Sequence, residues 1–440
     1  MARHAVLRHR DFNLYWSGVI LSEIGTRGTF AAVLYHVYQL SGSSLQVGLV
    51  GLAQAVALLV ILPLGGAIAD RLDRRRLLQA SQCLSLCASL TLAVLTIVDT
   101  IEVWHILAAV VVNTAAGSFE RPARDALIPA LVPRENLVHA FALLNPSREV
   151  AILVGPAIAG LLMAVWGPEA MYLLDVVSYV AIILALFLIK VPRHKVEPGR
   201  PNLWSSIGEC VRFVRGRPII LQLMGLDLAA TVFAMYRVLL PALAVDVLLV
   251  GAAGYGILAA VPSAGALVGS AVIFRVIDRL RSGHIVLGST VGYGLAAIGL
   301  GIAVALPSGL DFAFALVAAA GLGFFDATAT TVRHAAVQLE TPDEIRGRVT
   351  SIYQLASRGG PAVGNLNLGW LATVLGPVFA LVVGGMVPIL AASGMGMAGA
   401  RLSRYQVDRG SGSDGDDVAP DDTSSPSEEE EAASKDGRTT

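Results

Sequence analysis

The chain alternates between long apolar stretches and short polar connections, and this alternation predicts its elements. A membrane-spanning helix needs about 20 mostly apolar residues, and the sequence offers twelve windows of that kind. Glycine and proline inside the windows are compatible with helices, because both are commoner in membrane helices than in soluble ones. The predicted spans are residues 12–38, 44–69, 77–98, 103–120, 138–165, 169–189, 218–240, 251–274, 284–305, 311–332, 347–372 and 376–400.

Basic residues occupy every second connection. The connections at 39–46, 98–104, 165–170 and 306–312 contain no Arg or Lys, whereas the intervening ones are rich in Arg. Membrane proteins keep Lys and Arg on the cytoplasmic side. We therefore expect a multi-pass protein of the cell (inner or plasma) membrane with both termini in the cytoplasm. The first span lacks a short apolar core ending at a small-residue cleavage site, so it is expected to be retained.

Composition agrees with a membrane protein and separates the body from a tail. The chain is 55% apolar and 15% charged, against roughly 45–50% and 25% for soluble domains. Residues 405–440 hold eleven acids and three bases, which leaves 29 bases and 22 acids in residues 1–404. The body is thus basic (+7) and the tail acidic (−8). We expect residues 403–440 to form a disordered acidic cytoplasmic tail, because they lack apolar periodicity.

Two halves of six spans flank a basic connection. Residues 191–217 form this cytoplasmic connection and are expected to include a short amphipathic helix on the inner surface. An offset of 209 carries Gly155, Gly160, Gly167, Pro168 and Arg124 onto Gly364, Gly369, Gly376, Pro377 and Arg333. Residues 1–190 and 218–402 therefore resemble one duplicated unit. Parallel repeats with a site between them are a transporter architecture. The predicted fold class is an all-α membrane protein of twelve transmembrane helices in two pseudo-symmetric halves.

Charged residues inside spans are functional candidates, because each costs about 2.5–3.5 kcal/mol on insertion scales. Nine occur here: Glu23, Arg27, Arg148, Glu149, Asp175, Asp227, Arg237, Asp326 and Arg358. Glu23 and Arg27 share a helix face, which fits either a structural ion pair or an acid that exchanges protons. Asp227 and Arg237 are close to three helical turns apart, so they also share a face but lie about 15 Å apart along the axis. Each is then predicted to meet another helix.

Several classes of protein lack their signatures here. None of the three lysines ends a phosphate-binding Gly-Lys-Ser/Thr loop, so no ATP site is expected. The arginines lie in short loops and not in a soluble basic domain, which argues against nucleic-acid binding. No catalytic constellation appears, and the three cysteines have no metal-ligand spacing. We expect a small-molecule substrate and the lipid bilayer as partners, a monomer, no metal, no cofactor and no enzymatic activity.

The segment "GGAIADRLDRRRLL" resembles the loop 2–3 signature of the major facilitator superfamily. The matching residues are Gly66, Asp70, Arg71, Arg74 and Arg75, and Asp73 stands where the signature has glycine. "ERPARDALIPALVPRENLVHAFALL" and "DEIRGRVTSIYQL" are similar to the enterobactin-exporter-like branch, which includes macrolide and drug exporters; the resemblance covers residues 8–400. "ILVGPAIAG" resembles the helix-5 antiporter signature at Gly155, Pro156 and Gly160, with Ala151 and Ala159 where the fuller pattern has glycine.

The resemblance implies a secondary transporter driven by an ion gradient. Its expected function is export of a small amphiphilic molecule, siderophore-, macrolide- or drug-like, by proton antiport with alternating access. The alternative is a proton-coupled importer of a small metabolite on the same fold. Because helices 1, 4, 7 and 10 line the cavity in this superfamily, the proton-coupling candidates are Glu23, Arg27, Asp227 and Asp326. The substrate-cavity candidates are Phe30, Tyr236, Arg237, Phe324, Phe325, Arg148 and Arg358. Asp70 is expected to meet the start of helix 11 near Arg346 and Arg348, as a cytoplasmic gate.

Overall fold

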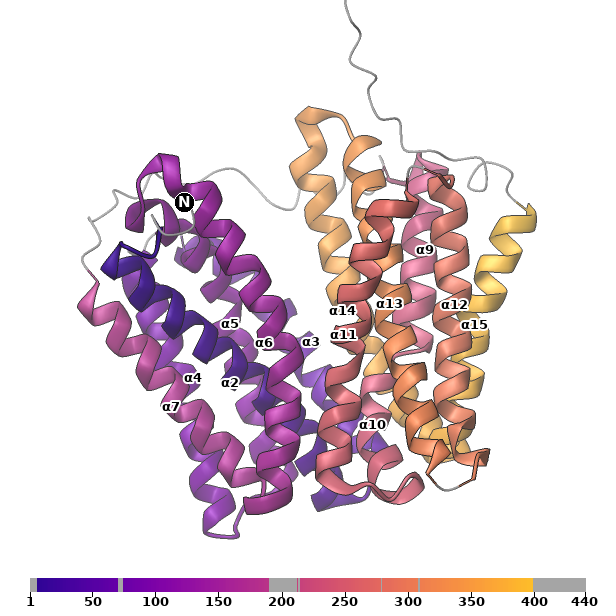
Figure 1. The fold of residues 1–440 in the computed structure, drawn as a ribbon, viewed down its shortest axis with the longest axis horizontal. Helices are drawn as coiled ribbons and strands as arrows, with labels where there is room; N and C mark the ends of the chain where they lie inside the picture. Colours follow the sequence, from indigo (N-terminus) through magenta and orange to yellow (C-terminus); the bar gives the residue numbers. More distant parts are fainter. Residues whose placement is uncertain are drawn as a thin grey trace, which may run out of the picture. The chain divides into compact units, whose positions relative to one another are not determined.

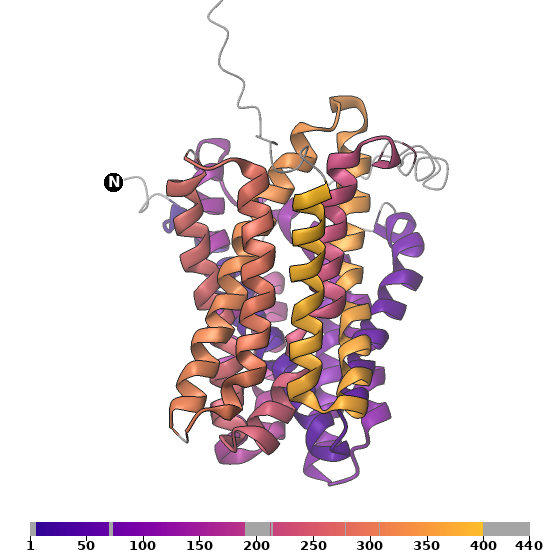
Figure 2. The ribbon, with the colours of Figure 1, turned by 90° about the vertical axis from the view of Figure 1, so that its right-hand side faces the viewer.

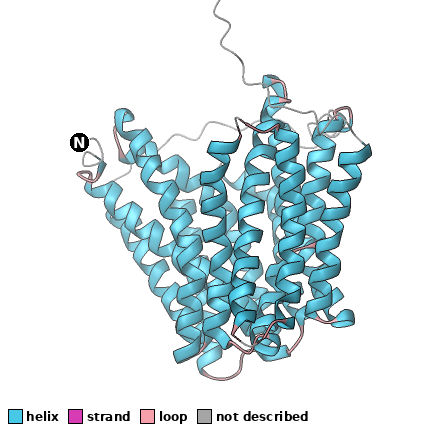
Figure 3. Cartoon of the chain, turned by 45° about the vertical axis from the view of Figure 1, so that its right-hand side comes forward, coloured by secondary structure: helices cyan, strands magenta, loops and turns pink. Residues whose placement is uncertain are grey.

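The fold consists of long helices (Figure 1). The computed structural model describes residues 6–69, 74–189, 212, 214–277, 279–307 and 309–398, and it contains no strand within these ranges (Figure 3). The helices of the first half are α2 (Arg10–Ser41), α3 (Ser44–Ala69), α4 (Arg74–Ile97), α5 (Val103–Leu131), α6 (Leu137–Trp166) and α7 (Pro168–Leu188). Those of the second half are α9 (Pro218–Phe233), α10 (Leu240–Ala242), α11 (Gly251–Val276), α12 (Ser282–Ile302), α13 (Leu310–Leu339), α14 (Asp343–Leu375) and α15 (Pro377–Ala398).

Most of the predicted spans are long and apolar enough to cross a membrane. Nine helical segments within the described ranges meet both conditions. The other three expected spans coincide with α2, α3 and α14. The described apolar part of α3 is the shorter stretch Ser44–Leu58, and α2 and α14 carry several charged residues. The all-helical membrane fold is confirmed, and the full number of twelve spans stays a prediction.

Two helices extend further than their apolar windows predicted. The windows ended at residues 120 and 332, whereas α5 continues to Leu131 and α13 to Leu339. The apolar windows end early because charged residues follow the apolar runs. Both helices continue because an arginine in each extension is buried against carboxylates. Arg124 and Arg333, which follow the predicted spans, therefore lie inside α5 and α13 and not in connections between helices.

The packing of the first half is repeated in the second. In the first half α2 packs on α6 and α7, α4 packs on α5 and α7, and α3 packs on α5. In the second half α9 packs on α14 and α15, α12 packs on α13 and α15, and α11 packs on α13. Figure 2 shows α15, in yellow, beside α9 and α12. The halves meet where α3 packs on α14 and α6 packs on α11 (Figure 1). These matched pairs follow the order of the sequence repeat.

The seventh predicted span, residues 218–240, is a broken helix. α9 ends at Phe233, and a 3-10 turn (Tyr236–Leu239), α10 and a π-helical turn (Leu243–Val247) follow. Pro241 stands in the first turn of α10, where the missing N–H of a proline is tolerated. The prediction that Asp227 and Arg237 share one continuous helix face is therefore wrong.

Side chains from other helices satisfy the backbone at this break. The Tyr293 hydroxyl donates to the carbonyl oxygen of Ala234 at 3.1 Å, and Asn367 Nδ2 donates to that of Val232 at 3.1 Å. Within a bilayer no water replaces lost helical hydrogen bonds, so protein groups must do so. The break is thus held from α12 and α14.

Part of the predicted gate lies outside the described residues. This applies to Asp70 and Arg71, to the side chains of Arg74, Arg346, Arg348 and Arg358, to most of the connection at 191–217 and to the acidic tail. Gly66 lies within the helical backbone of α3. Arg75, at the start of α4, donates to the carbonyl oxygen of Phe187 at 3.3 Å and so ties α4 to the end of α7.

Candidate functional site

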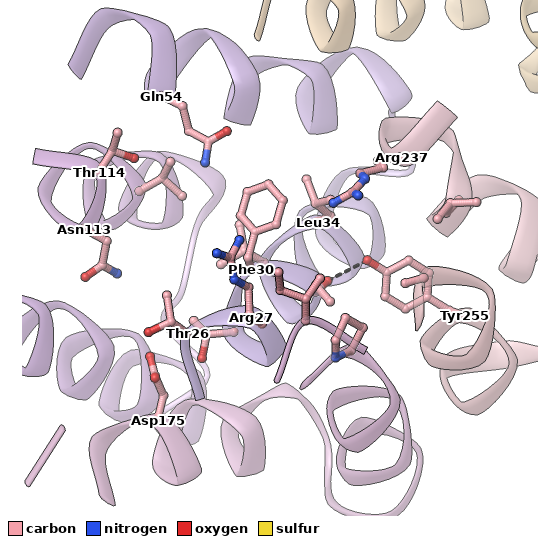
Figure 4. A pocket seen from close by; sticks show the side chains of 18 of the residues that line it. Thr26, Arg27, Phe30, Leu34, Gln54, Asn113, Thr114, Asp175, Arg237 and Tyr255 are labelled. Atoms are coloured by element: carbon pink, nitrogen blue, oxygen red, sulfur yellow. Dashed lines mark hydrogen bonds between the residues drawn. The ribbon is translucent and has the colours of Figure 1, made fainter. Parts of the chain in front are cut away.

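A cavity of about 330 Å³ lies between the two halves (Figure 4). Its walls come from α2, α3, α5, α6 and α7 on one side and from the Tyr236–Leu239 turn, α10 and α11 on the other. The polar lining includes Arg27, Arg237, Asp175, Gln54, Asn113 and Thr114. Apolar and aromatic side chains complete it, so the cavity presents both kinds of surface that an amphiphilic ligand requires.

Two of the predicted substrate-cavity residues, Phe30 and Arg237, line this space. The proton-coupling candidate Arg27 also lines it, and Figure 4 shows all three around the cavity. The Arg27 side chain is 49% exposed, although Arg27 Nε also lies 3.6 Å from Glu23 Oε2 in the predicted pair. Arg237 lies over the ring of Tyr236, 5.9 Å from its centroid.

Other predicted cavity residues do not line the described cavity. Tyr236 is 5% exposed and packs in the core. Phe324 and Phe325 form an edge-to-face pair on α13, and the Phe325 ring packs against Gly292 of α12. Arg148 on α6 is also absent from the lining. Helical periodicity places these residues in spans, but it does not fix the direction of each side chain.

A buried arginine organises a cluster in the first half. Arg124 on α5 is 4% exposed; its guanidinium lies 2.7 Å from Glu23 Oε1 and 3.1 Å from Glu120 Oε2. Glu23 comes from α2, and Glu120 precedes Arg124 by one helical turn. The Tyr15 hydroxyl donates to the carbonyl oxygen of Arg124 at 3.0 Å. Together with Arg27, the cluster balances two acids with two bases.

A second buried arginine occupies the equivalent place in the second half. Arg333 on α13 is 2% exposed, and its Nη2 lies 2.8 Å from Asp227 Oδ1 and 3.7 Å from Asp326 Oδ1. Ser357 on α14 donates to Asp227 Oδ2 at 2.6 Å. The Asp326 side chain is 57% exposed, so one carboxylate of this cluster is accessible while the other is buried.

The two clusters repeat each other, and sequence reasoning missed their central residues. Arg333 follows Arg124 by 209 positions, and Asp227 follows Glu23 by 204. In both halves the acid of the first helix meets the arginine of the fourth. Neither arginine was a candidate, because both follow the ends of the predicted spans at residues 120 and 332. The 209-residue offset already carried Arg124 onto Arg333, and it was the signal that could have identified them.

The glycines of the helix-5 motif allow two different close approaches. A Cβ on Gly155 would lie 2.7 Å from Arg27 Cβ, so Gly155 lets α6 approach α2 within the first half. A Cβ on Gly160 would lie 2.5 Å from the Cα of Gly256, so Gly160 lets α6 touch α11 of the other half. Pro156, between them, lines the cavity. Small residues of this kind let membrane helices approach each other closely.

The contacts between the halves gather at one end of the helices. The Tyr38 hydroxyl donates to Asp246 Oδ2, and the Gly160 and Gly256 backbones touch near the start of α11. Near the start of α3, a Cβ on Gly369 would lie 2.6 Å from the carbonyl oxygen of Ser44. All of these positions lie close to the connections at 42–43, 167, 248–250 and 376. The structure is therefore closed at the end that carries these connections.

The repeated helix packing, the cavity between the halves and the buried charges define a secondary transporter of the major facilitator superfamily, and not an enzyme. Within that superfamily the chain belongs to the transmembrane secretion effector family, which it matches over residues 1–414. It lies in the branch that resembles the enterobactin exporters.

Individual relatives and solved structures agree with this class. The chain is 28% identical over 376 residues to the enterobactin exporter EntS of Salmonella choleraesuis (strain SC-B67), covering 82% of this chain and 86% of the relative. The crystal structure of the nucleoside transporter NupG superposes with a TM-score of 0.70 at 12% identity, covering 90% of this chain and all (100%) of NupG. A bacterial homologue of the lysosomal transporter Spinster, inward-facing and unoccupied, gives 0.62 at 16% identity, with 91% and 96% covered. These structures show the shared fold.

Proposed function

We propose that the protein exports a small amphiphilic molecule, siderophore-, macrolide- or drug-like, by proton antiport. The observation that carries the proposal is the pair of matched carboxylate–arginine clusters, one in each half. Charged groups inside a membrane protein are costly and commonly mark proton or substrate pathways. The name of the EntS relative supports the direction of transport and the substrate class. The ion gradient replaces any cofactor or ATP.

Proton exchange at these clusters would change how the helices hold together. Glu23 on α2 pairs with Arg124 on α5, and Asp227 on α9 pairs with Arg333 on α13. A proton on either acid removes that ion pair and loosens the two helices. The arginine keeps a second carboxylate, Glu120 or Asp326, so it is not left buried without a partner. Each cluster can therefore gain and lose a proton while the half stays folded.

Substrate binding is linked to the first cluster through Arg27. This side chain faces the cavity and also lies 3.6 Å from Glu23 Oε2. A substrate that draws Arg27 into the cavity weakens its hold on Glu23. The Glu23 carboxylate then keeps Arg124 as its ion-pair partner but loses Arg27. Substrate and proton would thus alter each other's binding.

The predicted orientation of the chain determines which side of the membrane the closed end faces. With both termini in the cytoplasm, as the basic connections predict, the closed end faces outward and the cavity belongs to an inward-facing state. In the outward-facing state Asp70 would meet the start of α14 near Arg346 and Arg348, as the gate motif predicts. The protein would act as a monomer, each chain holding a complete cavity.

Everted membrane vesicles test the proposal. The probes are radiolabelled enterobactin, a radiolabelled macrolide and a fluorescent amphiphilic dye. We expect at least one probe to accumulate when the vesicle interior is acidic, and accumulation to cease when a protonophore collapses the gradient. Glu23→Gln and Asp227→Asn should each abolish most gradient-driven uptake, because neither amide can carry the exchanged proton.

Two exposed acids provide matched controls. Glu135→Gln and Asp99→Asn make the same chemical changes at exposed positions and should transport normally. Uptake that survives the protonophore, together with normal transport by Glu23→Gln and Asp227→Asn, would exclude proton coupling at these residues. Accumulation of the same probe by intact cells, and its loss on deletion of the gene, would indicate an importer.

A further inference from the structure

Four charged side chains are buried in the described part of the chain: Arg124, Asp175, Asp227 and Arg333. Three of them form the ion pairs of the two clusters. Asp175, on α7, has 0% exposure and forms no ion pair with any described residue. It nevertheless lines the cavity, where Figure 4 shows it below Thr26. Of these four buried charges, Asp175 is therefore the one that belongs to neither cluster.

Neutral polar groups from three helices surround this acid. Ser89 on α4 donates to Asp175 Oδ2 at 2.7 Å, and Ser178 Oγ donates to the Asp175 carbonyl oxygen at 2.7 Å and lies 3.4 Å from Oδ1. Gly25 on α2 makes room for the carboxyl group, because a Cβ there would lie 2.6 Å from Oδ1. The site is therefore built by α2, α4 and α7 together.

The Thr29 hydroxyl on α2 completes the site. Thr29 is 5% exposed, and its hydroxyl interacts with the Asp175 carboxyl group. Buried hydroxyl groups are normally hydrogen-bonded, and in this part of the chain the carboxyl group is the partner that Thr29 meets. The hydroxyl therefore belongs to the polar shell of a buried acid that has no cation beside it.

The titratable groups that face Asp175 do not neutralise it. Tyr179 lies one turn further along α7, and Glu120 faces the site from α5. Glu120 is itself acidic and is held by Arg124, and α4 contributes Ser85 and Ser89. On α2 the nearest cation towards the cavity is Arg27, which pairs with Glu23. A negative charge on Asp175 would therefore be buried without compensation, which is strongly unfavourable.

We propose that Asp175 is a proton-binding site of the cavity, separate from the two arginine clusters. A protonated carboxyl group has one O–H donor, and Thr29 Oγ1 is the buried acceptor beside it. One proton thus removes the uncompensated charge, and the new O–H donates to the Thr29 hydroxyl oxygen. Ser89 and Ser178 remain as donors to the other oxygen atoms. When the cavity fills with water, the O–H bond breaks and the proton passes to a water molecule, leaving a carboxylate solvated by water and the two serines.

Infrared difference spectroscopy detects this proton without a substrate. The full-length protein in lipid nanodiscs is titrated with acid and base, and the C=O stretching band of protonated carboxyl groups is recorded. We expect a band that Asp175→Asn removes and that the exposed control Asp99→Asn leaves intact. Thr29→Val should shift the band because the acceptor is lost, whereas Thr29→Ser should leave it in place.

Two results would overturn the proton site. The first is a complete set of bands in Asp175→Asn, which would show that Asp175 stays ionised. The second is loss of the band when NaCl replaces KCl at constant pH, which would indicate that the carboxylate and hydroxyl oxygens hold a sodium ion. Correct folding of each variant is checked by its elution as a single species, and Thr29→Val tests the site with Asp175 present.

The role of this site in transport rests on the proposed proton antiport. In everted vesicles Asp175→Asn is expected to lower gradient-driven uptake of the selected probe at least tenfold, with Asp99→Asn unchanged. Gradient-dependent uptake equal to the wild type in Asp175→Asn would overturn a coupling role for Asp175 and leave the proposed antiport standing. Gradient-independent uptake by the wild type would instead refute the antiport, while the infrared band would still decide whether Asp175 binds a proton.

Discussion

Arg124→Ala is expected to abolish transport and to lower the free energy of unfolding by about 3–5 kcal/mol, the usual cost of removing one partner from a buried ion pair. The reason is geometric. Arg124 is 4% exposed and is bonded to Glu23 at 2.7 Å and to Glu120 at 3.1 Å. Without Arg124, the carboxylates of Glu23 and Glu120 lie between α2 and α5. Of these two acids, Glu23 still has Arg27 as a basic partner, at 3.6 Å. The measurement is the thermal unfolding midpoint of the detergent-solubilised protein together with vesicle transport.

Three further variants separate folding from function. Arg134→Ala removes an exposed arginine and should leave both stability and transport unchanged. Arg124→Lys keeps the charge but lacks the planar fork that reaches two carboxylates, so intermediate stability is expected. The triple variant Glu23→Gln, Glu120→Gln and Arg124→Gln removes the three charges of the Arg124 pairings, leaves the half-exposed Arg27, and should regain stability without transport. Wild-type stability and transport in Arg124→Ala would contradict a central role for the cluster.

Gly160→Ala is expected to open the closed end of the transporter. The added Cβ would lie 2.5 Å from the Cα of Gly256 and 2.8 Å from the carbonyl oxygen of Ala252, both on α11 of the other half. The contact is backbone against backbone, so no flexible side chain can move aside. Overpacking costs about 1–3 kcal/mol. In the proposed cycle only the closed state makes this contact, so its population should fall roughly 5–150-fold relative to the open state.

Cysteine accessibility measures this shift. Ser263 lines the cavity on α11, so Ser263→Cys is introduced into a chain in which Cys83, Cys87 and Cys210 are replaced by serine. A membrane-impermeant maleimide applied to intact cells should label this position faster when Gly160→Ala is added. Gly117→Ala is the control, since a Cβ there meets no atom within 4 Å. Equal labelling in all three chains would show that α6 and α11 do not form the outer gate.

Gly155→Ala distinguishes packing within a half from packing between halves. Its Cβ would lie 2.9 Å from the backbone nitrogen of Gly28, on α2 of the same half. In the proposed cycle each half moves as a unit, so that contact is kept whichever end of the transporter is open. The helix-5 motif therefore combines a glycine that holds one half together with a glycine that lets the two halves meet.

The apolar windows predicted the helices well, because burial of apolar length in a bilayer leaves few alternatives to a helix. Their ends were less predictable. α5 and α13 continue past charged residues because Arg124 and Arg333 find carboxylate partners inside the protein. A window of mean hydropathy counts such charges as the end of a span. The partners lie on other helices, and a local window does not include them.

The break in the seventh span shows a similar limit. Pro241 is visible in the sequence, but proline alone is common in membrane helices. The hydrogen bonds from Tyr293 and Asn367 that hold the break come from α12 and α14. Sequence reasoning placed Asp227 and Arg237 on one face because it assumed a continuous helix. It had no means of finding groups that lie far away in the chain and satisfy the free carbonyls.

The sequence identified several of the charged residues of the candidate site, but it did not predict the direction of each side chain. Glu23, Arg27 and Asp227 were identified because charge inside a span is rare, and all three take part in the clusters. Phe325 was placed in the cavity because it lies near Asp326, whereas its ring packs on Gly292. Side-chain direction depends on the rotation of each helix against its neighbours. In these nearly all-apolar helices the hydrophobic pattern defines that rotation weakly.

The central claim is that substrate and protons cross in opposite directions through these clusters. It is tested most directly in proteoliposomes that hold the purified protein and an internal pH-sensitive dye, with no gradient imposed at the start. The probe selected by the vesicle assay is added outside. The account predicts that probe entry is accompanied by loss of internal protons, and that Asp227→Asn abolishes this alkalinisation whereas Asp99→Asn does not. Entry of the probe with no change in internal pH would contradict it.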